Sequence, residues 1–61
     1  METIKQVLMR RDGLTKESAD ELIADAKATL DAYFQEGDLE SAENICEEFF
    51  GLEPDYLFEL L

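Results

Sequence analysis

The segment from Thr15 to Gly51 constrains the fold most, because its pattern predicts two helices joined by a Gly-Asp turn. Gly37 can adopt the left-handed conformation that ends a helix, and the Asp38 side chain can accept from the free N–H groups of the next helix. Before this turn, apolar residues recur every three or four positions, as on one buried helical face. They are Ala19, Leu22, Ile23, Ala26, Leu30, Tyr33 and Phe34.

The second helix of this hairpin is expected from Leu39 to Phe50, with Gly51 ending it. Its inward residues are predicted to be Leu39, Ala42, Ile45, Cys46, Phe49 and Phe50.

Two shorter helices are expected on either side of the hairpin. Thr3 and Gln6 match a capping box for a helix from about Thr3 to Arg11, which Gly13 ends. Proline suits the first position of a last short helix, Pro54 to about Leu60. Because no strand-like alternation is present, the sequence predicts a single all-α domain, residues 1–61, of four helices. The long helix and the third form its antiparallel core pair.

The short length of the chain limits the stability of its fold, and the sequence indicates no disulfide bond or structural metal site that would add to it. A chain of 61 residues buries only about 60% of its unfolded surface and is expected to be stable by a few kcal/mol. The single cysteine cannot close a disulfide within the chain, and a zinc site is not expected without histidine. We expect Cys46 to be a small core residue in a reducing cytoplasm; a reactive thiol or an intermolecular disulfide is the alternative.

The charge is strongly acidic and unevenly distributed. Sixteen acids stand against five bases, a formal net charge of −11. Residues 1–16 hold four bases and two acids, a net of +2, whereas the remainder holds fourteen acids and one base, a net of −13. Such a charge disfavours direct binding to nucleic acid or to anionic membranes, so a partner is expected to be basic or neutral. Arg10 and Arg11 are predicted to complement a helix C-terminus rather than to form a basic patch.

The residue types argue against a membrane segment, an enzyme and a metal site. No apolar run approaches the roughly 20 residues that span a bilayer, and no signal-peptide core is evident, so a cytoplasmic location is expected. No histidine is present, and no serine or cysteine lies in a recognisable nucleophile motif. We therefore expect no enzyme and no cofactor. The acids around Gly37 lack the ligand ladder of an EF-hand, and capping already explains Asp38.

A cluster of glutamates on the third predicted helix is the main candidate site. Glu43 and Glu47 are like charges four residues apart, which costs about 0.2–0.5 kcal/mol, and anions are unfavourable near a helix C-terminus. Unfavourable local charge without compensation is typical of functional surfaces. One hypothesis is an interaction face for a basic protein; the alternatives are a merely solvated face and mimicry of nucleic acid. The candidate face consists of Glu40, Glu43, Glu47 and Glu48.

A second candidate surface is apolar. Adjacent apolar residues point about 100° apart on a helix, so one neighbouring helix cannot cover both. Packing among several helices is the simpler interpretation. If Phe50, Phe58 and Leu61 stay exposed, they would form a contact patch for a partner or a second copy. The chain is therefore expected to be a monomer or a weak homodimer.

Residues 30–54 resemble the core of a single tetratricopeptide-repeat hairpin. The matching pattern is Leu30-x-x-Tyr33-Phe34-x-x-Gly37-Asp38-Leu39-x-x-Ala42, followed by Phe49, Leu52 and Pro54. The large aromatic usual near the start of such a repeat is missing, with Ala26 around that place. One repeat cannot form the concave peptide groove of an array, so the resemblance supports hairpin geometry and not peptide binding.

The full chain also resembles short acidic proteins of bacteria and their phages, which are generally of unassigned function. The resemblance lies in Val7-Leu8-Met9-x-Arg11-x-Gly13-Leu14-Thr15-x-Glu17-x-Ala19-Asp20-x-Leu22-Ile23 and in Phe50-Gly51-Leu52-Glu53-Pro54-Asp55-Tyr56. It implies a prokaryotic cytosolic protein, and it slightly favours mimicry or interference with a host protein.

Overall fold

The computed structural model describes residues 2–61 and contains no strand in that range. The predicted all-α class is confirmed, but the described part of the chain has five helical segments instead of four. They are α1 (Ile4–Arg11), α2 (Lys16–Glu36), α3 (Leu39–Glu43), α4 (Ile45–Phe50) and the 3-10 helix η1 (Pro54–Leu60).

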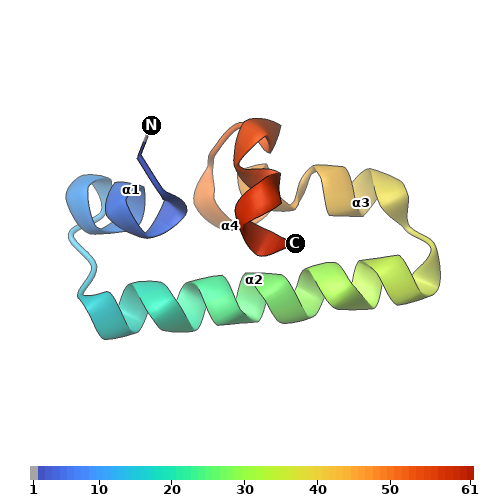
Figure 1. The fold of residues 1–61 in the computed structure, drawn as a ribbon, viewed down its shortest axis with the longest axis horizontal. Coiled ribbons are helices and arrows are strands. Elements are labelled where there is room, and N and C mark those ends of the chain that lie inside the picture. Colours follow the sequence, from blue (N-terminus) through green and yellow to red (C-terminus); the bar gives the residue numbers. More distant parts are fainter. Residues whose placement is uncertain (1) are drawn as a thin grey trace.

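The long helix α2 is the base on which the other elements lie. Its 21 residues correspond to about 31 Å of helix, and the molecule measures 33 × 20 × 16 Å. Figure 1 shows α1 along the first half of α2, α3 along its second half, and α4 with η1 between them, all on one side. The core therefore lies in a single layer between α2 and the elements that cover it, and the far face of α2 is open to solvent.

Side-chain caps begin α1 and α2 at the predicted threonines, whereas Glu53 makes no side-chain cap for η1. The Thr3 hydroxyl accepts from the Gln6 N–H at 3.2 Å, and the Gln6 side chain accepts from the Thr3 N–H at 2.9 Å, which completes the capping box. The Thr15 hydroxyl accepts from the Ser18 N–H at 3.1 Å and begins α2. These hydrogen bonds satisfy donors that the first turn of a helix leaves free.

The Gly-Asp turn forms as predicted between α2 and α3. Gly37 has φ +74° and ψ +17°, and the Asp38 N–H donates to the Tyr33 carbonyl at 2.9 Å. The Asp38 carboxylate accepts from the Ser41 N–H at 3.1 Å, and the hydrogen bonds from Ser41 lower the pKa of Asp38. One residue thus ends α2 and the next begins α3.

The expected third helix, Leu39 to Phe50, is wrong in one respect, because the chain breaks it at Asn44. The Asn44 side chain donates to the Glu40 carbonyl at 3.1 Å, whereas its backbone N–H donates to the Ser41 carbonyl at 3.2 Å. The amide side chain therefore takes the carbonyl that the backbone N–H would use in a continuous α-helix, a known competition for asparagine. Two short helices, α3 and α4, replace one long one.

The interior contains most of the residues that the apolar spacing in the hairpin predicts, with two corrections. Phe34 is 44% exposed and Leu39 is 61% exposed, although both were expected to face inward. Phe34 lies beyond the edge of the covering layer because its neighbour Tyr33 already points toward the core. Leu39 is the first residue of α3, directly after the Gly-Asp turn. The buried apolar residues are Ile4, Val7, Leu8, Ala19, Ala26, Leu30, Ala42, Ile45, Cys46, Phe50 and Leu60.

Two polar contacts join α1 to the C-terminal part of the chain. The Arg11 guanidinium donates to the Phe50 carbonyl at the end of α4. The Glu59 carboxylate, on η1, accepts from the Ile4 N–H at 3.0 Å. The first free N–H of α1 therefore has its partner on the last helical element.

Cys46 lies inside the core, as the sequence predicts for a small core residue. The residue is fully buried, and burial together with the charge of Glu59 raises the pKa of its thiol. Both effects disfavour the reactive thiolate.

We therefore predict that Cys46 is protected from Ellman's reagent in the folded domain. With about 3 kcal/mol of stability, reaction through opening is expected to be about a hundredfold slower than in the denatured chain. The measurement compares the labelling rate in buffer with that in concentrated urea, with circular dichroism as the check of folding. Labelling at the denatured rate while the helical signal is native would contradict the burial of Cys46.

Candidate acidic interface

The four glutamates of the candidate face are all exposed, but they do not form one continuous stripe. Glu40 and Glu43 belong to α3, whereas Glu47 and Glu48 belong to α4. Because the chain breaks at Asn44, the two pairs lie on two separate helical segments. The expected single helical stripe is therefore corrected to two adjacent acidic pairs, called here the α3–α4 acidic face.

A shallow depression lies at the junction of these two helices. It is lined by Asn44, Glu47 and Glu48, and its volume is about 490 Å³. The Tyr33 hydroxyl, from α2, donates to the Glu48 carboxylate at 3.3 Å. Burial raises the pKa of Tyr33, and the negative charge of Glu48 adds to this effect. Glu48 is thus oriented from α2, while within residues 2–61 no ion pair involves Glu40, Glu43 or Glu47.

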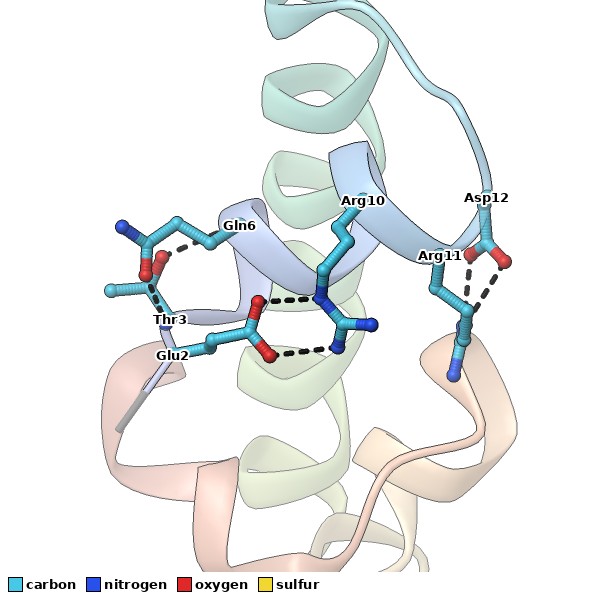
Figure 2. Close-up of polar contacts among 6 residues, drawn as sticks. All are labelled: Glu2, Thr3, Gln6, Arg10, Arg11 and Asp12. Carbon is cyan, nitrogen blue, oxygen red and sulfur yellow. Dashed lines mark hydrogen bonds and ion pairs between the residues drawn. The ribbon is translucent and has the colours of Figure 1, made fainter.

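The bases of α1 are engaged by acids close to them, as Figure 2 shows for two of the pairs. Arg10 binds Glu2 through two hydrogen bonds of 2.7 Å each, and Arg11 binds Asp12 through two of 2.9 and 2.8 Å. These contacts lower the pKa of Glu2 and of Asp12.

Lys5, also on α1, pairs with Asp20 at 2.9 Å. The described residues thus give α1 no unneutralised basic patch. All acids that lack an ion pair within residues 2–61 lie from Glu17 onward. The excess negative charge therefore belongs to the later part of the chain, and the first helix offsets it only at Asp20.

The predicted apolar patch is wrong for one of its three residues. Phe58 is 61% exposed and Leu61 is 77% exposed, but Phe50 is only 2% exposed. Phe50 packs in the core, with its ring centroid 6.2 Å from that of Phe49. The adjacent pair Phe49–Phe50 is covered from two sides, by α2 and by η1, which the spacing alone could not show.

An apolar groove that the sequence did not predict lies between α2 and the end of η1. Its volume is about 210 Å³, and it is lined by Lys27, Leu30, Asp31, Phe34, Leu60 and Leu61. The one sequence signal for it was the adjacent pair Tyr33–Phe34, whose second member could not share the buried face of the first.

Neither a metal-binding cluster nor a membrane-spanning helix occurs among the described residues. Among residues 2–61, no group of three or more histidine, cysteine or carboxylate side chains is placed to hold a metal ion. No helix in that range is long and apolar enough to cross a bilayer.

Comparison with protein-family models, curated proteins and solved structures gave no match. The two resemblances drawn from the sequence therefore stay predictions. The surface chemistry of the domain itself carries the functional argument.

Proposed function

We propose that this domain is a non-enzymatic interaction module of the cytoplasm, which binds a basic protein through the α3–α4 acidic face. The observation that carries this proposal is the set of four exposed glutamates at one helix junction, none of which has an ion-pair partner in the described chain. Their mutual repulsion is relieved when a basic surface approaches, so binding recovers an electrostatic cost that the free domain bears.

The lining of the depression supports a binding role over a catalytic one. It contains only Asn44, Glu47 and Glu48 and has no basic or nucleophilic side chain beside the carboxylates. General acid–base chemistry needs groups of opposed roles within hydrogen-bonding reach of a substrate. The depression offers two glutamates and an asparagine in an open setting, with no second group of opposite role.

Mimicry of nucleic acid by an inhibitor is the alternative, and the break at Asn44 disfavours it. A mimic of a phosphate backbone presents a regular row of negative charges. The turn at Asn44 places the two glutamate pairs on separate helical segments, which interrupts such a row. A compact basic surface on a partner protein fits two adjacent pairs better than a groove built for duplex DNA does.

The proposal predicts that Glu43→Lys/Glu47→Lys loses basic proteins captured from a bacterial lysate. Reversal of two charges at the contact turns attraction into repulsion, and we expect at least a tenfold loss of capture at low salt. The measurement is quantitative mass spectrometry of proteins retained on the immobilised domain at low and raised salt.

The matched control is Glu21→Lys/Asp25→Lys on the open face of α2. It changes the net charge by the same amount, and both residues are exposed and four positions apart. Equal losses for the two double variants would mean that only the overall charge matters, and the acidic face would then have no specific role. If the captured protein binds DNA and duplex DNA competes for it, mimicry replaces the proposed function.

A further inference from the structure

We propose that the groove between α2 and η1 receives a bulky apolar side chain from a basic polypeptide segment. This inference rests on the proposed function only in that the partner is basic. It concerns a different surface, made by the second half of α2 and the end of η1, and it names what would fill it.

The groove has an apolar floor and an apolar mouth. Leu30 and Leu60 are 2% and 6% exposed and form its base, while Phe34 and Leu61 are 44% and 77% exposed. The two exposed residues come from different elements, α2 and the residue after η1, so the mouth can contact an inserted side chain on more than one side. Burial of such a side chain removes apolar surface of both molecules from water.

The volume of the groove favours a single side chain over a metabolite as its occupant. Its volume of about 210 Å³ is below the roughly 300–1,000 Å³ of sites that enclose drug-sized ligands. Well-packed pockets that accept one aromatic side chain are typical of the energetic centres of protein interfaces. A single anchor residue therefore matches the space available.

Charge selects a basic segment over a second copy of the chain. The rim carries Lys27 and Asp31, one charge of each sign, so the groove itself is electrically neutral. The field around it comes from the remainder of the domain, in which residues 17–61 hold fourteen acids and one base. Two copies, each with a net charge of −11, repel one another, whereas a lysine-rich segment is attracted.

The test uses a synthetic lysine-rich peptide with one tryptophan, and the same peptide with glutamine in its place. Both carry a fluorescent label, and their affinities are measured by anisotropy. Because the domain has no tryptophan, the indole emission also reports directly on entry into an apolar site. We expect the tryptophan peptide to bind at least tenfold more tightly than the glutamine peptide.

The variants Phe34→Ala and Leu61→Ala are expected to remove most of that tenfold difference. Phe58→Ala is the matched control, because Phe58 is 61% exposed and does not line the groove. Leu61 is 77% exposed, so its replacement keeps the fold even if Phe34→Ala weakens it. Equal affinity of the two peptides, or equal effects of Phe34→Ala and Phe58→Ala, would overturn the proposal.

Further outcomes separate this proposal from the proposed function. If Glu43→Lys/Glu47→Lys weakens both peptides while Phe34→Ala has no effect, the acidic face stands and the groove proposal fails. If only Phe34→Ala and Leu61→Ala weaken peptide binding, the groove proposal stands and the proposed function of the acidic face is refuted. If sedimentation shows a dimer that Phe34→Ala dissociates, the groove is covered by a second copy, and the basic occupant is wrong.

Discussion

Replacement of Leu8 by alanine is expected to unfold most of the domain at room temperature. Leu8 is completely buried, on the face of α1 that points into the core. Truncation of such a leucine costs about 2–5 kcal/mol, and a core of this size rarely supplies more than about 3–5 kcal/mol in total. Thermal and urea denaturation, followed by circular dichroism, should show the loss of the cooperative transition.

Leu39→Ala is the matched control for this prediction. It removes the same atoms from a side chain that is 61% exposed, at the first residue of α3. Alanine is a better helix former than leucine, so stability should change by no more than about 0.5 kcal/mol. Equal destabilisation by the two substitutions would contradict the division between buried and exposed leucines.

The second large effect is expected at the turn between α2 and α3, where Gly37→Ala should destabilise the domain by about 1–2 kcal/mol. Gly37 has φ +74°, and a Cβ at this position would meet nothing within 4 Å. The cost is therefore backbone strain rather than a clash. Because the total stability is small, the urea midpoint should fall by a large fraction of its original value.

D-alanine at position 37 separates strain from other causes. A chain of 61 residues is accessible to chemical synthesis, and a D-residue prefers the positive φ that the turn requires. Stability at or above that of the natural chain is expected, since the methyl group restricts the unfolded state without straining the folded one. If D-alanine and L-alanine destabilise equally, the left-handed conformation is not what this position requires.

The helix ends were predictable because their causes are local. Thr3, Thr15 and Asp38 cap helices with side chains that reach only three residues along the chain. Gly37 and Gly51 end helices through backbone conformation alone. Interactions of such short range can be inferred from the order of residues before any tertiary contact is known.

The break at Asn44 and the exposure of Phe34 and Leu39 were not predictable in the same way. Asparagine is tolerated within helices, and the sequence did not show that its side chain would take the Glu40 carbonyl. Apolar spacing shows which residues share a helical face, but it does not show how wide the covering layer is. That width decides that Tyr33 packs against the core while Phe34 remains 44% exposed.

Of the two candidate surfaces, the acidic face was predictable from the sequence and the apolar groove was not. Exposure of the four glutamates followed from their charge, since carboxylates are rarely buried without partners. The groove of Phe34 and Leu61 joins residues 27 positions apart in sequence, which only tertiary packing brings together. Surface charge was therefore readable from the sequence, whereas surface shape was not.

The contact between Glu59 and the Ile4 N–H has a consequence for the order in which the chain becomes structured during synthesis. Its two partners are 55 positions apart, and the Arg11 guanidinium likewise finds the Phe50 carbonyl 39 positions later. A ribosome delivers the first helix before either partner exists, and loops of such length close only after both ends are available. The α1 helix can therefore complete these two contacts only after Phe50 and Glu59 have left the ribosome.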